Sequence, residues 1–147
     1  MKLHIGWIGK TKEQAIAALT AEYIKRIQRY VPTDQHEFKS EAALLEFVAK
    51  EKIRPTLVLM DERGVHLSSA DFSRFISKHQ DRGTQSLMLA IGPADGFSDA
   101  ARKTAAAMLS LGKMVLAHEL ARVVLLEQVY RAFTILAGHP YHRGDKR

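Results

Sequence analysis

Two short runs of consecutive apolar residues, each bounded by segments with helical periodicity, constrain the fold of this chain most strongly. Thr56–Asp61 (TLVLMD) contains four consecutive apolar residues and Ser86–Ile91 (SLMLAI) contains five, a pattern typical of strands that are covered on both faces of a sheet. Lys2–Ile8 (KLHIGWI) alternates instead and is predicted to form a further strand. Strands separated by helices predict an α/β fold, with a mostly parallel sheet and helices on both of its faces.

Five other segments have the spacing or the capping residues of helices. Ser68 stands three residues before Asp71, which resembles a capping box, and Ser98 is predicted to be an N-cap. Gly138 provides a natural stop for the last helix. A short strand is predicted near HEFKS. The predicted helices cover Glu13–Tyr30, the segment EAALLEFVAKEK, a stretch that starts at Ser68, Asp99–Met108 and His118–Ala137.

The composition indicates one compact domain with a polyanionic partner. The chain has 147 residues, of which 46% are hydrophobic and 26% charged, as in ordinary folded proteins, and we expect a single domain over residues 1–147. Its net charge of +6 favours a nucleic-acid partner. No run reaches the roughly 18 apolar residues of a membrane span, and MKLHIGWIGK does not have the form of a signal peptide. We therefore expect a cytoplasmic protein with no membrane partner.

Two apparent motifs do not hold, one because of a residue type and one because of its spacing. HELAR (118–122) begins like the helix of a zinc protease, but Arg122 stands where the second metal ligand is required. GWIGKT resembles a phosphate-binding loop, yet only two residues separate its glycines where four are needed. The chain also contains no cysteine, which excludes thiolate ligands and thiolate nucleophiles. The sequence therefore predicts no metal site.

Three loops are candidates for ligand binding, because ligands of parallel α/β sheets bind at the carboxyl ends of the strands. These loops are DERG, which begins at Asp61, GPADG after Ile91, and LGKMVLAH before the last helix. Gly92 directly follows a buried strand, where a glycine lets the backbone approach a ligand, and Gly96 offers a positive φ for the next turn. A plain strand-to-helix turn explains the same two glycines.

The basic residues of the last helix have two interpretations. His118 and Arg122 stand one helical turn apart, and so do Glu127 and Arg131. Such pairs form weak ion pairs on a helix surface. Alternatively, the two arginines contact a nucleic acid.

The terminal residues are equally ambiguous from the sequence alone. Tyr141 offers a stacking surface, His142 a group that titrates near neutrality and Arg143 a planar cation. These residues either bind a base and a phosphate of a nucleic acid or form a solvated basic tail.

Three motifs taken together resemble one family. IGxxxGFS, LSLGKMVLAHELARVVLLEQVYRA and the terminal PYHR resemble the ribosomal large-subunit methyltransferase H family of small trefoil-knot (SPOUT-class) enzymes, and GKTKEQ, EYIKRI and MDERGVHLSS extend the similarity over nearly the whole chain. The resemblance implies a carboxy-terminal trefoil knot, although chains are usually unknotted. It implies a homodimer that uses S-adenosylmethionine to methylate N3 of a pseudouridine in the helix 69 loop of 23S ribosomal RNA. The alternative is a ribosome-binding module without catalysis, which explains the basic charge equally well but not the cofactor stretch or PYHR.

The resemblance also implies a cofactor site built from the backbone of the three loops and free of metal. Two departures from the family bear on this site. The family commonly has Leu where Met60 stands, and a second Gly where Pro93 stands and offers no N–H donor. The implied cofactor-binding residues are Met60, Gly92, Leu111, Gly112, Lys113, Met114, Val115 and Leu116.

By the same resemblance, the tail completes the active site across the dimer. Tyr141, His142 and Arg143 are expected to face the target base, and Arg131 joins them as a catalytic candidate. His142 is predicted to accept the N3 proton, or Arg143 to stabilise the resulting anion. Arg122, Arg131, Tyr141 and Arg143 are predicted to hold the RNA.

The last predicted helix gives a separate argument for the homodimer. It carries more than one apolar stripe, as a helix buried on two sides would. A central core helix within a single chain would show the same pattern. The residues that form these stripes are Val123, Leu126, Val129, Tyr130 and Phe133.

Overall fold

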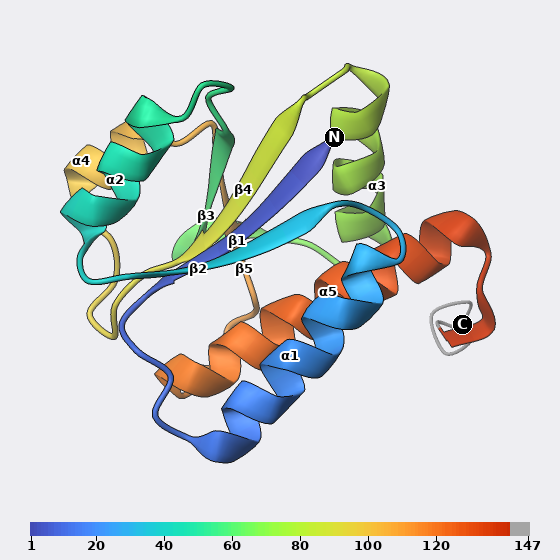
Figure 1. Ribbon diagram of the computed structural model, residues 1–147, viewed down its shortest axis with the longest axis horizontal. Helices are drawn as coiled ribbons and strands as arrows, with labels where there is room; N and C mark the ends of the chain where they lie inside the picture. Colours follow the sequence, from blue (N-terminus) through green and yellow to red (C-terminus); the bar gives the residue numbers. More distant parts are fainter. Residues whose placement is uncertain (142–147) are drawn as a thin grey trace.

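The computed structural model describes residues 1–141, and over this range it contains one parallel five-stranded sheet between two layers of helices (Figure 1). The strand order is β2-β1-β4-β3-β5, and every neighbouring pair is parallel. The strands are β1 (Lys2–Ile8), β2 (Thr33–Phe38), β3 (Thr56–His66), β4 (Ser86–Ile91) and β5 (Ala107–Ser110). The helices are α1 (Gln14–Gln28), α2 (Glu41–Lys50), α3 (Ser69–Asp81), α4 (Asp99–Thr104) and α5 (His118–Ala137).

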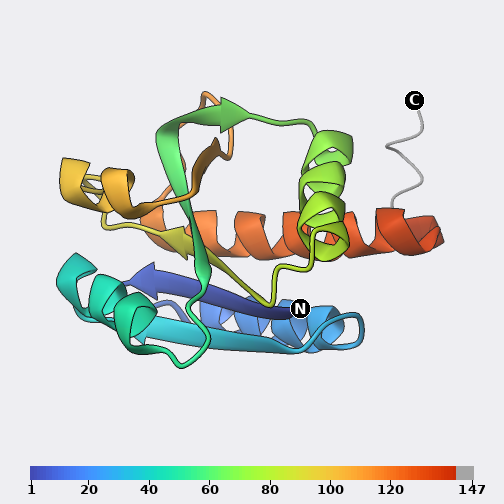
Figure 2. The ribbon, with the colours of Figure 1, turned by 90° about the horizontal axis from the view of Figure 1, so that it is seen from above.

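The sheet is buried on both faces, as its apolar strands predict. Helices α1, α3 and α5 cover one face, and α2 and α4 cover the other (Figures 1 and 2). Alternate residues of a strand point to opposite faces, so in β4 Leu87 and Leu89 pack toward the first layer while Met88 and Ala90 pack toward the second. This alternation divides the core into two clusters and confirms the predicted α/β fold with helices on both faces.

The predicted helix caps are present. The Oγ atom of Ser68 accepts a hydrogen bond from the N–H of Asp71 at 3.0 Å, and Oγ of Ser98 accepts one from the N–H of Ala101 at 3.2 Å. Each such cap stabilises its helix by about 1 kcal/mol. Gly138 ends α5 in the left-handed conformation with φ of 71°, which a glycine adopts without steric cost.

The prediction that the helix after Ser98 extends to Met108 is wrong. Helix α4 ends at Thr104, and β5 begins at Ala107. The alanine-rich stretch AAAM has high helix propensity, but pairing with β3 outweighs it. The N–H of Ala106 donates to the carbonyl of Leu57 at 2.8 Å, and Met108 then pairs with Leu59.

Strand β3 extends beyond its predicted end and contains a bulge. Met60 and Val65 both pair with Leu109 of β5, so residues 61–64 loop out of the ladder. Gly64 closes this bulge, because a Cβ atom there would lie 2.6 Å from backbone atoms of Leu109. Only a glycine permits this approach without a backbone shift, a requirement that the sequence alone did not reveal.

Helix α5 packs between α1 and α3. Leu126, Val129, Tyr130 and Phe133 are buried, and Val123 is half-buried, within the single chain. The alternative interpretation as a central core helix therefore accounts for the apolar stripes, and the homodimer needs other support. The trefoil knot likewise stays a prediction.

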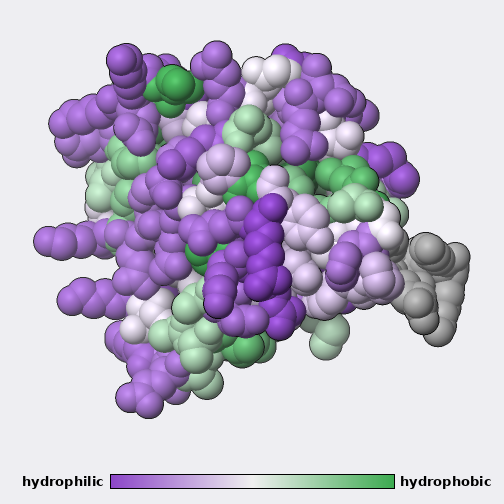
Figure 3. Space-filling view, turned by 45° about the vertical axis from the view of Figure 1, so that its right-hand side comes forward, coloured by the Kyte–Doolittle hydropathy of each residue, from purple (hydrophilic) through white to green (hydrophobic). Residues whose placement is uncertain are grey.

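The surface seen in Figure 3 is mainly hydrophilic, with hydrophobic residues in small separate patches. Among the helices of residues 1–141, none is both long and apolar enough to cross a bilayer.

Candidate active site

The bulge of β3 and the carboxyl ends of β4 and β5 lie at the same edge of the sheet, where the three predicted ligand loops are found. Met60 near this edge pairs with Ile91 of β4 on one side and with Leu109 of β5 on the other. Its side chain lines three separate cavities. A ligand site at this edge is what a parallel sheet of this kind predicts.

The first cavity has a volume of about 170 Å³ and is lined by Met60, Ile91 and all of Leu111–Leu116. The predicted cofactor stretch thus lies against Met60. Gly112 shapes the stretch, with φ of 133°. Its N–H donates to Oγ of Ser110 at 3.1 Å, and the same hydroxyl donates to the carbonyl of Gly112 at 3.0 Å. The result is a tight turn that leaves the following backbone beside the cavity.

The second cavity, of about 400 Å³, is lined by Met60 and the loop 92–97. Met60 and Ile91 line both this cavity and the first one, so Gly92 lies at a cavity that neighbours the one lined by Leu111–Leu116. The reason for the glycine differs from our expectation, however. A Cβ atom on Gly92 would lie 3.0 Å from the ring of Phe97, so a side chain there would collide with the protein's own core and not with an open ligand space.

The bulge of β3 is held by a buried ion pair at the rim of the second cavity. Oδ2 of Asp61 lies 3.1 Å from Nε of Arg102, and the Asp61 side chain is only 2% exposed. Its other oxygen accepts the N–H of Arg63 at 2.9 Å. The carboxylate is thus fully used in fixing the DERG loop to α4, because buried charges require such partners.

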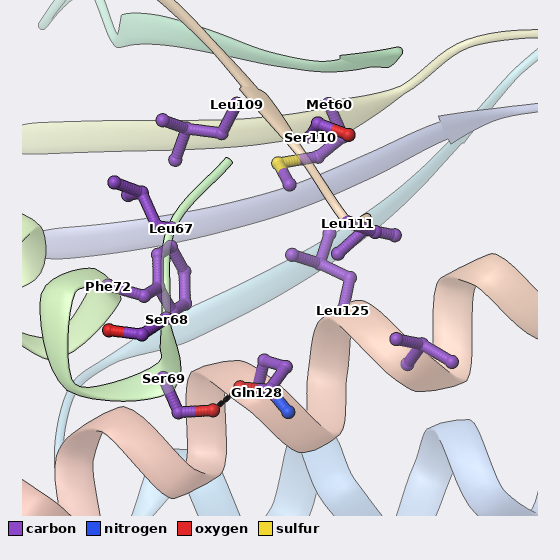
Figure 4. A pocket seen from close by; sticks show the side chains of 11 residues that line it. Met60, Leu67, Ser68, Ser69, Phe72, Leu109, Ser110, Leu111, Leu125 and Gln128 are labelled. Carbon is purple, nitrogen blue, oxygen red and sulfur yellow. Dashed lines mark hydrogen bonds between the residues drawn. The ribbon is translucent and has the colours of Figure 1, made fainter. Parts of the chain in front are cut away.

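The third cavity, of about 310 Å³, opens between the end of β5, the start of α3 and helix α5 (Figure 4). Met60 and Leu111 are shared with the first cavity, so the two cavities are neighbours. The ring of Phe72 forms an apolar wall, and Oγ of Ser69 donates to Oε1 of Gln128 at 2.6 Å. The sequence did not predict this polar pair, because its members come from distant segments and belong to no motif.

Two residues predicted to act with the tail, Arg131 and Tyr141, both contact Glu127 of α5. The hydroxyl of Tyr141 donates to Oε2 of Glu127 at 2.7 Å, and Nη2 of Arg131 lies 2.9 Å from the same oxygen. The Arg131 guanidinium also lies over the Tyr141 ring, 5.2 Å from its centroid. Nε2 of Gln128 donates to the other Glu127 oxygen at 3.1 Å. A chain of hydrogen bonds therefore connects Tyr141 to the third cavity.

The hydroxyl of Tyr141 acts as a hydrogen-bond donor in this arrangement. Burial, with hydrogen bonds that involve Tyr23 and Glu127, raises the pKa of its phenol well above the ordinary value. The hydroxyl therefore stays protonated at neutral pH. It does not supply a general base.

Arg122 does not fit its predicted contact with RNA. It is 0% exposed. Its guanidinium lies over the Trp7 ring, 5.0 Å from the centroid, and donates to Oγ1 of Thr11 at 2.8 Å and to the carbonyl of Gly9 at 3.2 Å. Nη2 also lies 2.9 Å from Nε2 of His118. Arg122 therefore joins the start of α5 to the loop after β1, and in this conformation no part of it reaches a phosphate.

Two predicted catalytic residues and the exposed part of the predicted cofactor stretch remain. His142 and Arg143 lie outside the described residues, so their predicted roles stay predictions. Lys113, Met114 and Val115 are exposed at the first cavity.

A family model described as "Predicted SPOUT methyltransferase" matches residues 1–142. The chain belongs to this family. The resemblance inferred from the carboxy-terminal motifs is therefore confirmed at the level of the family, and with it the expectation of a methyltransferase.

Curated relatives match along almost their entire length. "Ribosomal RNA large subunit methyltransferase H" of Koribacter versatilis (strain Ellin345) is 55% identical over 98% of this chain and 99% of its own. The protein of the same name from Geobacter sp. (strain M21) is 43% identical over 97% and 99%.

Solved structures support the fold. A probable rRNA-methyltransferase from Porphyromonas gingivalis aligns with a TM-score of 0.58 and 16% identity, over 92% of this chain and 69% of its own. The SpoU methyltransferase AviRb from Streptomyces viridochromogenes, in complex with AdoMet, aligns with a TM-score of 0.52 and 15% identity, over 87% and 56%. At these identities the similarity concerns the fold alone.

Proposed function

We propose that this protein transfers a methyl group from S-adenosylmethionine to N3 of a pseudouridine in the helix 69 loop of 23S ribosomal RNA. It acts in the cytoplasm as a homodimer. One observation carries the proposal: of the residues implied to bind the cofactor, Met60 and Leu111–Leu116 line a single cavity at this edge of the sheet and Gly92 lines a neighbouring one, in a chain of the SPOUT methyltransferase family. A ribosome-binding module without catalysis does not account for this combination.

The residues around the first cavity fit S-adenosylmethionine. Its adenine has flat apolar faces and a polar edge, which suit a site of aliphatic side chains and backbone groups. Met60, Ile91 and Leu116 supply the apolar surfaces, and the turn at Gly112 places backbone of the stretch 111–116 at the same cavity. The cofactor, when bound, supplies an electrophilic methyl group on a sulfonium.

Positioning of the two reactants then accounts for most of the catalysis, since in-line methyl transfer requires little else from the protein. The third cavity borders the first at Met60 and Leu111. Its size and its Ser69–Gln128 pair suit a pyrimidine base beside the cofactor. Arg131 and Tyr141, joined to this cavity through Glu127 and Gln128, hold the RNA near it.

Removal of the N3 proton is assigned to the tail. Tyr141 is not assigned as the base, because its hydroxyl already donates to Glu127 and burial raises the pKa of the phenol. His142 accepts the proton, or Arg143 stabilises the anion, because the family resemblance implies that both residues face the target base. A positioned base accelerates such a step by about 10²–10⁴-fold.

Two measurements on one truncated protein test this division of labour. Deletion of Pro140–Arg147 should leave the calorimetric affinity for S-adenosylmethionine within about threefold of wild type, because the cofactor stretch precedes α5. The same deletion should abolish methyl transfer to ribosomal RNA. Wild-type transfer rates in the truncated protein would refute the role of the tail, and absence of cofactor binding by the full chain would refute the proposed function itself.

A further inference from the structure

Three residues with metal-binding side chains meet far from the candidate active site, near the amino ends of β1 and β2. They are His4, Asp34 and His36, and one ligand-type atom from each lies within 4.8 Å of the others. His4 is buried, with 6% of its surface exposed, whereas His36 is half-buried and Asp34 is exposed. The cluster is therefore anchored in the protein and still open to solvent. The sequence did not indicate it, because the two histidines belong to different strands.

The register of the sheet brings these residues to one face. His4 is paired with Asp34, and Gly6 is paired with His36. Residues two apart in a strand share a face, so all three side chains project toward the side that α2 covers. The imidazole rings are inclined at 28° with their centroids 5.1 Å apart, so they meet edge to edge.

The two imidazoles face each other through nitrogen atoms. Nδ1 of His4 lies 2.9 Å from Nε2 of His36, and two such nitrogens share one proton when no metal is bound. In a tetrahedral zinc site with Zn–N bonds of about 2.0–2.1 Å, two ligating nitrogens lie about 3.3 Å apart. The observed separation is slightly shorter, and because the two nitrogens point at each other, an ion requires both rings to turn toward it in addition to a small shift. Strand β2 is an edge strand and bonds only to β1, so a shift of this size breaks no other strand pairing.

The walls of the cluster keep both rings in place. The ring of Phe47 on α2 lies 4.5 Å from the His36 ring and 5.7 Å from the His4 ring, centroid to centroid. The ring of Phe38 also packs against the His36 ring, with 5.8 Å between their centroids. Packed aromatic neighbours of this kind fix ligand orientation before a metal binds.

Asp34 already pairs with a cation at this position. Its Oδ2 lies 2.8 Å from Nζ of Lys2, and both side chains are substantially exposed, at 51% and 43%. Exposed ion pairs contribute about 0–1 kcal/mol. Replacement of the ammonium group by a divalent ion therefore costs little.

We propose that His4, Asp34 and His36 bind a divalent transition-metal ion such as Zn²⁺, with solvent completing the coordination. Two imidazoles and one carboxylate suit Zn²⁺, Ni²⁺ or Cu²⁺, whereas Mg²⁺ and Ca²⁺ prefer oxygen ligands alone. The bound ion joins edge strand β2 to β1. It is separate from the candidate methyl-transfer site, for which we propose no metal.

Zinc titration of the untagged full chain after dialysis against a chelator tests this proposal. Calorimetry should show one Zn²⁺ per chain, and addition of Zn²⁺ should raise the thermal unfolding midpoint, because a ligand that binds the folded state stabilises it. His36→Gln should weaken binding at least about tenfold, about 1.4 kcal/mol, and Asp34→Asn about threefold. Mg²⁺ should give no heat.

The controls are exposed histidines outside the cluster, His66→Gln and His139→Gln, which should bind Zn²⁺ as the wild type does. His36 and Asp34 are at the solvent side of the cluster, so their variants should fold, as circular dichroism will show. Unchanged zinc affinity in His36→Gln, loss of binding in either control variant, or no binding by the wild type at 1:1 stoichiometry would each overturn the proposal. In the last case the histidine pair is only a hydrogen bond between strands.

Discussion

Arg122 illustrates how burial changes the meaning of a basic residue. In the sequence it looks like Arg131, since each stands one turn from a partner on α5. In the structure Arg122 is buried against Trp7, while Arg131 is partly exposed beside Glu127 and Tyr141. Helical spacing predicts which residues share a face but not which face lies inside. The sequence therefore predicted an arginine pair and could not assign the different roles of its members.

Arg122→Ala should lower the free energy of unfolding by about 2–4 kcal/mol, because it leaves a cavity beside Trp7 and leaves the hydrogen-bond acceptors of Arg122 without a donor. Urea unfolding measures this loss. Lys103→Ala, at an exposed lysine of α4, is the control and should change stability by less than about 0.5 kcal/mol. A loss below about 1 kcal/mol for Arg122→Ala would show that the guanidinium is not a structural link between α5 and the loop after β1.

Gly112 gives a cleaner test of the cofactor stretch than Gly92 does. A Cβ atom on Gly112 would meet nothing within 4 Å, so Gly112→Ala costs only the strain of its positive φ, about 1–3 kcal/mol. The turn should relax and displace the stretch, which should weaken S-adenosylmethionine binding at least about tenfold. Calorimetry on the folded variant checks this. If Gly112→Ala binds S-adenosylmethionine with the affinity of the wild type, the Gly112 turn is not part of the cofactor site.

At the scale of elements, the sequence predicted most of the sheet and the helices. Strand β4 and helix α5 have their predicted bounds, because a fully apolar strand run and a long helix with a glycine stop are strong local signals. Strand β5 was missed because its four residues follow an alanine-rich stretch and are held by pairing with β3. The bulge at Gly64 depends on the same long-range pairing. The bulge of β3 and strand β5 at this edge of the sheet were thus the parts that the sequence did not predict.

The start of α5 should be sensitive to acid. Burial, reinforced by the charge of Arg122, lowers the pKa of His118 below its ordinary value of 6.5. The unfolded chain therefore takes up a proton first. The stability that comes from neutral His118 is complete above about pH 6.5 and decreases as the pH falls toward the lower folded pKa.

His118→Gln should consequently flatten the dependence of unfolding free energy on pH between about pH 5 and pH 7, since glutamine accepts the Arg122 hydrogen bond without titrating. Urea unfolding across this range measures the slope. Some slope should persist, because burial also lowers the pKa values of His4, His36 and His79. A variant slope equal to that of the wild type would exclude His118 as a contributor.

At the scale of the whole molecule, the exposed apolar residues near α5 support a homodimer. Met114 and Val115 are 85% and 93% exposed at the first cavity, and Leu120 in the first turn of α5 is 44% exposed. Apolar residues gathered at one place on a surface often mark a protein interface. Light scattering at micromolar concentration should give the mass of a dimer.

Leu120→Glu should shift that equilibrium toward the monomer, because it places a charge in the predicted interface. Ile53→Glu is the matched control, since Ile53 is 54% exposed between α2 and β3, and it should leave the dimer intact. A monomeric wild type would refute the dimer. If both substitutions shift the monomer–dimer equilibrium equally, the interface does not lie near Leu120.

The central claim is methyl transfer to one position of ribosomal RNA. The most direct measurement is to incubate the wild-type protein with S-adenosylmethionine and ribosomes that lack the modification, and to locate the added methyl group by mass spectrometry of the helix 69 fragment of 23S RNA. The account predicts one methyl group on N3 of a pseudouridine in that loop, with no requirement for added metal. A fragment that stays unmethylated although the protein binds the cofactor, or a methyl group found at another position, would contradict it.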